Sequence, residues 1–237
     1  MGFIKGSKVV RIPLTTVKEQ ERESIGGFTE TRKMPWISWS TPAVRCQVGS
    51  RLRDVPGSTC SGCYARKGNY MYPNVQSSLE RRFQALENLA QWQADMIIAL
   101  LERAARWEGE GRPAFRWHDS GDIQSAAHLA SICAVARATP GIDHWLPTRE
   151  FGYVAEYFSA GGKRPKNLTI RLSAHMIDGT APLALARKYR LAVSTVHTAE
   201  NNYPAAAICP AYRQGGECGE CRNCWNNKVA HVSYPKH

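Results

Sequence analysis

The clearest pattern along the chain is a repeated unit in which a short apolar strand leads into a polar turn and then into an amphipathic helix. The predicted strands cover residues 113–117, 142–147, 167–172 and 191–196, and the predicted helices cover residues 125–138, 153–159 and 181–189. Residues 34–40 alternate apolar with small polar side chains and predict the first strand of the body. Strands that alternate with helices at this spacing imply parallel strands joined by right-handed crossovers. We therefore expect an α/β fold, a partial or small (β/α) TIM-like barrel.

A longer apolar pattern precedes these units. From Ser77 to about Trp107, apolar residues recur at every third or fourth position, which predicts one long helix that starts at Ser77 or Ser78 and stops at Gly109. Four arginines are expected to form a solvated face, namely Arg81, Arg82, Arg103 and Arg106.

The length of 237 residues allows a sizeable core, and we expect a single domain over residues 1–237. Residues 1–33 are polar and charged and predict an irregular arm or an outlying strand pair, residues 34–200 predict the barrel, and residues 201–237 form a cysteine-rich segment. No stretch approaches ~18 uninterrupted apolar residues, and the start lacks the apolar region of a signal peptide. We expect a soluble cytoplasmic protein with no membrane span, in the host cytoplasm if it is encoded by a phage.

The end of the chain carries four cysteines in sixteen residues, Cys209, Cys218, Cys221 and Cys224. Two residues separate each of the last three, a spacing that lets their thiolates converge on one soft metal centre. Zinc sites usually draw four thiolates from two separated C-x-x-C hairpins, so this triplet favours a 4Fe-4S cluster, with zinc as the alternative. Disulfides are disfavoured in a reducing compartment.

A second group of cysteines, Cys46, Cys60 and Cys63, lies in the long Gly- and Pro-rich loop after the first predicted strand. Three thiolates on a four-iron cluster leave one iron free to bind another molecule. The eighth cysteine, Cys133, sits in an apolar helical pattern and is expected to be a buried core residue. The two groups hold two clusters, or they meet in space and share one.

Polar residues follow every predicted strand. In a (β/α) barrel the active site lies on the loops at the carboxyl ends of the strands. We expect His118, Asp119, Asp122, Arg149 and Glu150 to be catalytic, and Ser173, His175 and His197 to contact a cofactor.

Several of these residues have more than one possible role. His118, Asp119 and Asp122 are suited to acid–base catalysis, to a metal or to the hydroxyls of a nucleoside. Arg149 either grips a carboxylate or phosphate or pairs with Glu150. Other polar residues have structural readings: Ser120 or Ser125 as a helix cap, His128, His144 and His231 as packing residues, and Arg171 as a buried, paired strand residue.

The charge balance adds a class of partner. Lys and Arg number 31 against 20 Asp and Glu, which gives a net charge of +11. Such a surface favours polyanions, so nucleic acid or a phosphorylated substrate is the expected partner. Nothing in the sequence indicates the oligomeric state.

Several motifs together resemble those of the gene product 88 family of phage and mobile-element proteins. The matching pieces are PGSTCSGCYA at residues 56–65 with KG at 67–68, FRWHDSGD at 115–122, WLPTRE at 145–150, STVH at 194–197, and the terminal run from Cys218 to Pro235. The resemblance implies a phage or prophage origin and says little about the reaction.

A more distant resemblance is to radical S-adenosylmethionine enzymes, which are partial (β/α) barrels with a three-cysteine 4Fe-4S cluster after the first strand, many with a further cluster in a cysteine-rich C-terminal segment. This chain has both features in the same order. It departs from their C-x-x-x-C-x-x-C motif, because thirteen residues separate Cys46 from Cys60 and the aromatic Tyr64 follows the last cysteine. It also has no Gly-Gly-Glu motif after the second strand.

The sequence thus leads to an iron–sulfur protein with one or two 4Fe-4S clusters and radical or redox chemistry on a substrate related to nucleic acid. The resemblance implies S-adenosylmethionine as a further ligand. The alternative is a nucleic-acid-binding protein with a structural metal and no catalysis. A metal hydrolase is the weakest reading, because no H-x-H or H-x-x-x-H pair occurs.

Overall fold

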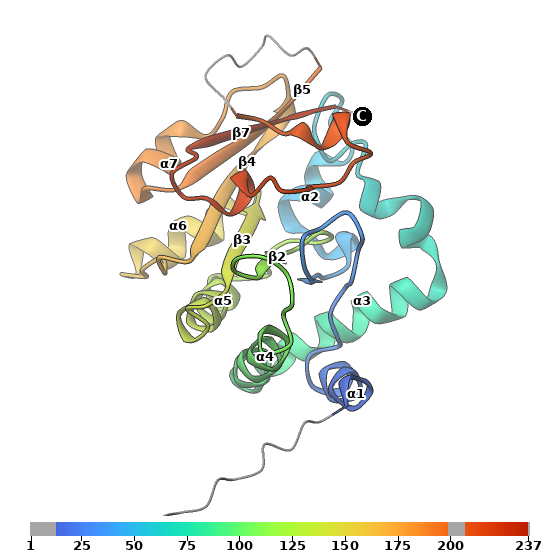
Figure 1. Ribbon diagram of the computed structural model, residues 1–237. Coiled ribbons are helices and arrows are strands. Elements are labelled where there is room, and N and C mark those ends of the chain that lie inside the picture. The colour runs from blue at the N-terminus through green and yellow to red at the C-terminus, as the bar shows by residue number, and fades with distance from the viewer. Residues whose placement is uncertain (1–12, 199–206, 237) are drawn as a thin grey trace, which may run out of the picture.

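The computed structural model describes residues 13–198 and 207–236 (Figure 1). Within these ranges seven strands form one sheet in the order β1-β2-β3-β4-β5-β7-β6, and every neighbouring pair is parallel. The strands are β1 (Ser38–Trp39), β2 (Ala114–Trp117), β3 (Asp143–Thr148), β4 (Leu168–Ile177), β5 (Ala192–His197), β6 (Ala207–Ile208) and β7 (His231–Pro235). This part of the chain is a mixed α/β fold whose parallel sheet stays open, with β1 and β6 at its edges.

The helices connect these strands. The α-helices are α1 (Leu14–Ser24), α2 (Gln47–Leu52), α3 (Pro73–Ala85), α4 (Leu89–Ala104), α5 (Ala126–Ala138), α6 (Phe151–Ser159) and α7 (Leu183–Tyr189). The short 3₁₀ helices are η1 (Ala43–Arg45), η2 (Tyr64–Arg66), η3 (Gly68–Met71), η4 (Leu86–Asn88), η6 (Pro210–Arg213) and η7 (Asn223–Trp225). Among the described helices, none has the length and apolar character needed to cross a membrane.

The two faces of the sheet have different covers. Phe115 and Trp117 of β2 point into the main core, which α4, α5 and α6 close from one side. Ala114 of β2 and Trp145 of β3 belong to a second, smaller core with Trp225 of the C-terminal segment. Figure 1 shows the same arrangement, with a row of helices on one side of the strands and the C-terminal segment crossing in front of them.

The prediction of an irregular arm or strand pair over residues 1–33 is wrong for residues 14–24, where the structure has helix α1, whereas residues 25–33 are irregular. Its apolar surface is small: Val17 is fully buried, and the Glu21 carboxylate pairs with Arg103 of α4. Tertiary contacts with α4, more than the local pattern, hold this helix in place. Residues 1–12 and the predicted boundary at 200/201 lie outside the described ranges.

The single long helix predicted from Ser77 to Trp107 is two helices, α3 and α4, separated by η4. Helix α3 ends at Ala85, and Asn88, the last residue of η4, caps α4, because its side chain accepts a hydrogen bond from the Gln91 N–H at 3.1 Å. The apolar pattern continues across the break, which is why periodicity alone does not reveal it.

The prediction of a solvated arginine face is also wrong for two of the four arginines. Arg82 is only 6 % exposed, and its Nε donates to the carbonyl of Gly27 at 2.7 Å. Arg103 donates to the carboxylates of Glu21 at 2.6 Å and Glu30 at 2.9 Å. Both arginines tie α1 and the turn after it to α3 and α4.

Gly121, in the turn after β2, is held in a conformation that other residues rarely adopt, with φ at +77°. A Cβ atom there would lie 2.5 Å from the carbonyl oxygen of Thr41. We expect Gly121→Ala to lower the free energy of unfolding by about 2–4 kcal/mol, through backbone strain and overpacking. Urea denaturation measures this loss. Gly141→Ala is the matched control, since a Cβ there meets no atom within 4 Å. Equal stability of the two variants would contradict this account.

Two core histidines predict how stability depends on pH. Burial lowers the pKa of His128 and of His144 to about 3, so both rings are neutral in the folded protein. The unfolded chain binds protons on these rings below pH of about 6.5, so folding stability falls as the pH drops from there towards 3. At about pH 4 the loss is about 3 kcal/mol for each histidine.

Urea denaturation at about pH 7 and about pH 4 tests this dependence. His144→Gln keeps a partner for the Thr139 hydroxyl, which lies 2.9 Å from the His144 Nε2 atom, and has no ring to protonate. This variant should lose less stability between the two pH values than the wild-type chain. The same loss in both would refute the assignment.

Candidate functional site

The loop that carries Cys46, Cys60 and Cys63 is fastened to the carboxyl end of the sheet. The Thr59 N–H donates to the carbonyl of His175 in β4 at 2.9 Å, and the Ile177 N–H donates back to the carbonyl of Gly57 at 2.9 Å. These paired hydrogen bonds make the loop an extra antiparallel partner for the end of β4. The cysteines therefore lie where the active site of a parallel α/β protein is expected.

Glu150, in the turn between β3 and α6, holds the other end of this loop. Its Oε1 atom accepts from the N–H groups of Gln47 at 2.9 Å and Val48 at 2.8 Å, at the start of α2. The carboxylate thus caps the helix that begins directly after Cys46. Glu150 does not form the predicted ion pair with Arg149 in the described structure, because its oxygen is used by this backbone.

The three thiols of the loop are free and half-buried. The Sγ atoms of Cys46 and Cys60 flank Gly49, at 3.6 Å and 3.7 Å from the position of a Cβ on that glycine. Burial raises the pKa of Cys46, and negative charge on Asp122, Cys63, Glu150 and Cys60 raises it further. The three sulfur atoms are therefore electrostatic neighbours beside two carboxylates.

Arg149 supplies positive charge to the same place. Burial raises the pKa of Cys60, and the guanidinium of Arg149 opposes that rise. The Arg149 Nε donates to the carbonyl of Ala174 at 3.3 Å, and the Arg149 carbonyl lies 3.3 Å from the His175 Nε2 atom. The His175 ring stacks on Phe151, with the ring centres 4.5 Å apart. These contacts bring Arg149 and His175 to the thiol group.

Asp122 positions the turn that carries Arg149. Its Oδ2 atom accepts from the Arg149 N–H at 2.9 Å and its Oδ1 atom from the Ile123 N–H at 2.8 Å. Burial raises the pKa of Asp122 to about 6 in spite of these hydrogen bonds, which favour the charged form. A carboxyl group poised near neutral pH beside thiols is suited to moving a proton.

Asp119 is enclosed by hydroxyl groups that the sequence patterns do not reveal. Ser38 donates to its Oδ1 atom at 3.2 Å and Tyr70 to its Oδ2 atom at 3.0 Å. The hydroxyl of Tyr64, the residue after Cys63, donates to the Asp119 carbonyl. Tyr64 and Tyr70 thus connect the cysteine loop to the turn after β2. The sequence signal that could have identified them is the number of tyrosines in this loop.

Three further predicted site residues contact groups other than the thiols. His118 has φ at +56° and is buried against the rings of Trp39 and His128, on the helix side of the sheet. Ser173 lies inside β4, not after it, and accepts from the Ser194 hydroxyl at 3.0 Å. His197 is the last residue of β5, and its Nδ1 atom contacts the Ser233 hydroxyl of β7.

His175 also lies inside a strand, because β4 runs to Ile177, five residues beyond the predicted end. The cysteine loop supplies the partner that prolongs this strand. A side chain that the sequence places on a loop is therefore fixed by sheet hydrogen bonds.

The four C-terminal cysteines lie on the face of the sheet away from the helices. The Trp225 indole donates to the carbonyl of Phe115 at 2.8 Å, and the Thr169 hydroxyl donates to the carbonyl of Trp225 at 2.6 Å. The Cys209 N–H donates to the carbonyl of Ser233 in β7 at 2.8 Å. The segment is thus attached to β2, β4 and β7.

The thiols in this segment are also free, and they are electrostatic neighbours of one another. Burial raises the pKa of Cys224 to about 12, and the charges of Cys209 and Cys218 add to the rise. Burial likewise raises the pKa of Cys218, with Cys209 and Cys221 among its charged neighbours. The Cys224 sulfur lies 3.1 Å from the Tyr234 hydroxyl.

Arg171 of β4 holds this segment against the sheet by hydrogen bonds. Its side chain is fully buried and donates to four carbonyl groups, those of Val193, Asn223, Cys224 and Val229, at 2.9–3.5 Å. The expectation that Arg171 is buried and partnered is confirmed, although its partners are backbone carbonyls.

Among the described residues, no three His, Cys, Asp or Glu side chains are arranged so that they could hold a single metal ion. The donor sets still fit a cluster in their chemistry, since each offers at least three unpaired, half-buried or buried thiols from one segment. Thiolates of a four-iron cluster bind different irons, so they do not need the close spacing that one ion requires.

A family model described as Gene product 88 matches residues 17–227. This range includes both cysteine groups and all of the strand-end residues discussed above. No curated protein and no solved structure matches the chain.

Proposed function

This chain belongs to the Gene product 88 family, and we propose that it is an iron–sulfur protein of the radical S-adenosylmethionine-like type. In this proposal the open parallel sheet is a partial (β/α) barrel. Cys46, Cys60 and Cys63 hold a 4Fe-4S cluster at its mouth. The reaction is radical or redox chemistry on a substrate related to nucleic acid.

The observation that carries the proposal is the position of three free thiols from one loop at the carboxyl end of the parallel strands. Asp122 and Arg149 lie beside them, one a carboxyl group with a pKa raised to about 6 and the other a cation. A cluster held by three thiolates supplies an electron and one open coordination position when it is bound. Thiols, a carboxyl group and a guanidinium together suit that chemistry better than they suit a structural staple.

We assign the remaining site residues by their neighbours. Arg149 is suited to grip a carboxylate or phosphate of a bound cofactor, with S-adenosylmethionine as the proposed one, and His175 lies against it. Asp122 would hold or move a proton. Glu150 positions Cys46 by capping α2, the helix that begins directly after this cysteine. His118 and Asp119 stay predicted catalytic residues, and Ser173 and His197 stay predicted cofactor contacts.

The four C-terminal thiols are proposed to hold a second cluster. Thr59, next to Cys60, and Trp225, next to Cys224, are attached to β4 at His175 and Thr169. These positions are six residues apart in one strand, which corresponds to about 20 Å. Separate anchoring at this distance supports two clusters over one that is shared.

The test is anaerobic purification followed by measurement of iron, sulfide and zinc per chain, with visible absorption before and after S-adenosylmethionine and a reductant are added. Two clusters predict brown protein with about eight irons, and one cluster predicts about four. Cleavage of S-adenosylmethionine would support an enzyme of the radical class. Colourless protein with stoichiometric zinc would overturn the iron–sulfur proposal.

The second candidate is a nucleic-acid-binding protein in which the metal is structural. The placement of Cys224 and Trp225 in the smaller core favours this role for the C-terminal group. Replacement of iron by zinc separates the two candidates. Fold and binding would survive it if the metal is structural, whereas the redox reaction would be lost.

A further inference from the structure

We propose that the loop around the three site cysteines binds a single-stranded nucleic acid, whose bases stack on exposed rings and whose phosphates meet arginine and lysine. We call this surface the cysteine lip and define it as residues 43–72 with Met176 of β4. The inference names the substrate class of the site proposed above, and so it rests on that function.

Exposed apolar side chains gather on the cysteine lip. Ten large apolar side chains are exposed among the described residues, and six of them belong to this surface: Val44, Val55, Tyr64, Met71, Tyr72 and Met176. The tyrosines are 58 % and 57 % exposed. The methyl group of Met176 lies 3.7 Å from a Cβ built on Gly57, so this side chain packs against the loop. Concentrated apolar exposure of this kind marks an interaction surface.

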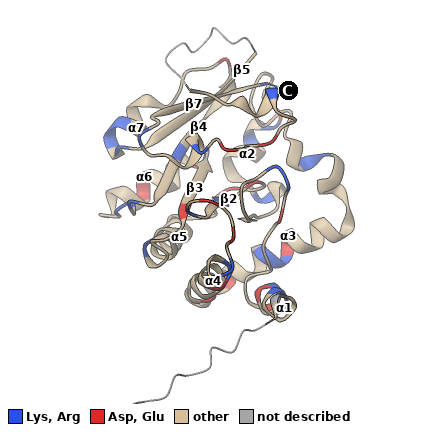
Figure 2. Cartoon of the chain, viewed as in Figure 1, with Lys and Arg blue, Asp and Glu red and all other residues tan. Residues whose placement is uncertain are grey.

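The same surface carries excess positive charge. Residues 43–72 contain five cations, Arg45, Arg51, Arg53, Arg66 and Lys67, and one acid, Asp54. Two of the cations are paired, Arg53 with Asp54 and Arg45 with Glu80. The other three make no ion pair with a described carboxylate. Figure 2 shows this charge on α2 and on the turns between α2 and α3.

Tyr64 provides a fixed ring next to the thiols. Its hydroxyl donates to the Asp119 carbonyl and accepts from the Arg116 Nη2 atom at 3.4 Å, while the ring stays exposed beside Cys63. A ring held by its hydroxyl loses little entropy when a base stacks on it, which makes it a suitable platform.

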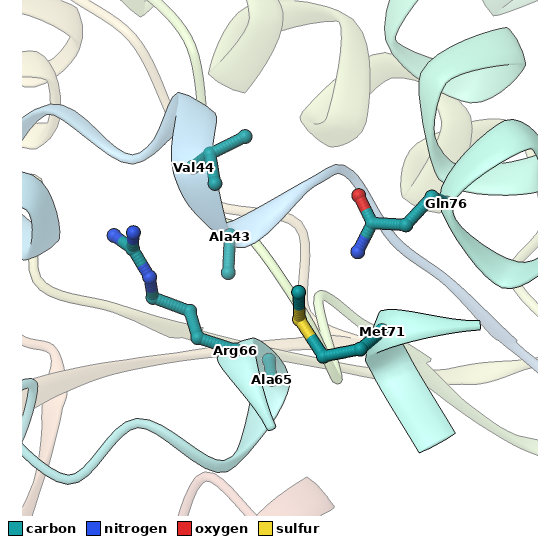
Figure 3. Close-up of a pocket in the computed structure, with 6 residues that line it drawn as sticks. All are labelled: Ala43, Val44, Ala65, Arg66, Met71 and Gln76. Atoms are coloured by element: carbon teal, nitrogen blue, oxygen red, sulfur yellow. The ribbon is translucent and has the colours of Figure 1, made fainter. Parts of the chain in front are cut away.

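A small hollow of about 120 Å³ adjoins this platform. Figure 3 shows Arg66 on one side of it, Gln76 on the other and the thioether of Met71 between them. A cation, an amide and an apolar group around one hollow suit a base with its attached phosphate.

Alternating rings and cations favour a single strand over other polyanions. A duplex keeps its base faces stacked inside, and an acidic peptide has no rings to stack on Tyr64 and Tyr72. Base stacking on aromatic rings and phosphate contacts with cations are the two terms that dominate single-strand binding.

Fluorescence anisotropy of the anaerobically purified, metal-loaded chain tests the proposal. The probes are labelled single strands of DNA and RNA of about 12 nucleotides, the DNA as a duplex, and labelled polyglutamate. We expect at least one single strand to bind more tightly than the duplex and polyglutamate do. Equal binding of polyglutamate would overturn the proposal in favour of an acidic protein partner.

Variants locate the binding surface. Tyr72→Ala should weaken single-strand binding about ten-fold, while Ile98→Ala, an equally exposed apolar residue on α4, should not. The double variant Arg51→Gln with Lys67→Gln should reduce the slope of log affinity against log salt by about 1.4, whereas Arg187→Gln with Lys188→Gln on α7 should leave it close to the wild-type value. Lip variants that bind as their controls do would refute the surface.

The visible absorption and iron content of each sample separate this inference from the proposed function. Brown protein that binds no single strand refutes the inference alone. Colourless protein that binds through Tyr72 supports the surface and refutes the iron–sulfur site.

Discussion

Replacing Cys60 by alanine is expected to remove about four of about eight irons and to leave a folded protein. The reason lies in the separate anchoring of the two thiol groups. Cys60 is in a half-buried loop outside both cores. The C-terminal thiols lie on the face of the sheet away from the helices. Loss of one of three thiolates should therefore empty the first site and spare the second. Iron and sulfide per chain, with thermal unfolding of the same sample, measure both parts of the result.

Two further variants complete this experiment. Cys133→Ala is the control, because this thiol is buried in α5 and belongs to neither group, so its iron content should equal that of the wild type. Cys221→Ala should also remove about four irons, from the second site. If either single variant lost all of the iron, the two groups would share one cluster, and if neither lost any, the thiols would not be ligands.

The regular part of the fold follows from periodicity. The strand predicted over residues 113–117 is β2 (Ala114–Trp117), and the helix predicted over 125–138 is α5 (Ala126–Ala138). Ser125 is the cap that α5 uses, since its hydroxyl accepts from the His128 N–H at 3.0 Å. In these units the local pattern and the tertiary contacts agree, so the sequence suffices.

The elements missed from the sequence depend on distant partners. Strand β7 has only five residues and pairs with β5 across the cysteine-rich segment, whose glycines and cysteines hide any strand pattern. Strand β1, predicted over seven alternating residues, covers only Ser38–Trp39, which pair with Arg116 and Trp117 at the end of β2. Between β2 and β5 the order of elements was predictable, and their lengths were set by neighbours.

The same distinction explains the site. The position of a residue after a strand predicts where its backbone lies, and this prediction brings Asp122, Arg149 and the three loop cysteines together. It does not predict the direction of a side chain. His118 turns to the helix side through a positive φ, which no pattern in the turn signals. The hydroxyls of Tyr64 and Tyr70 reach Asp119 from a loop that had no predicted structure.

Replacing Arg171 by methionine is expected to lower the free energy of unfolding by about 5 kcal/mol and to release the C-terminal segment from the sheet. Methionine fills much of the same volume but donates no hydrogen bond. The carbonyl groups of Val193, Asn223, Cys224 and Val229 would then lose a donor in a buried place. Each unsatisfied buried carbonyl costs about 1–3 kcal/mol. Urea denaturation of the metal-free and metal-loaded chains measures the loss.

Two variants show that the loss comes from these hydrogen bonds. Arg164→Met also removes a guanidinium that donates to two carbonyls, those of Pro165 and Leu168, but this arginine is half-buried, and water can replace it there. Its cost should be about 1 kcal/mol or less. Arg171→Lys keeps the charge without the planar donor geometry, and its loss of stability should fall between those of the two methionine variants.

The metal-loaded Arg171→Met chain should lose the iron of the C-terminal site and keep that of Cys46, Cys60 and Cys63, because Arg171 fixes the backbone on both sides of Cys224 and touches nothing in the cysteine lip. Retention of all iron at wild-type stability would show that the segment is held by its remaining contacts with β2 and β7.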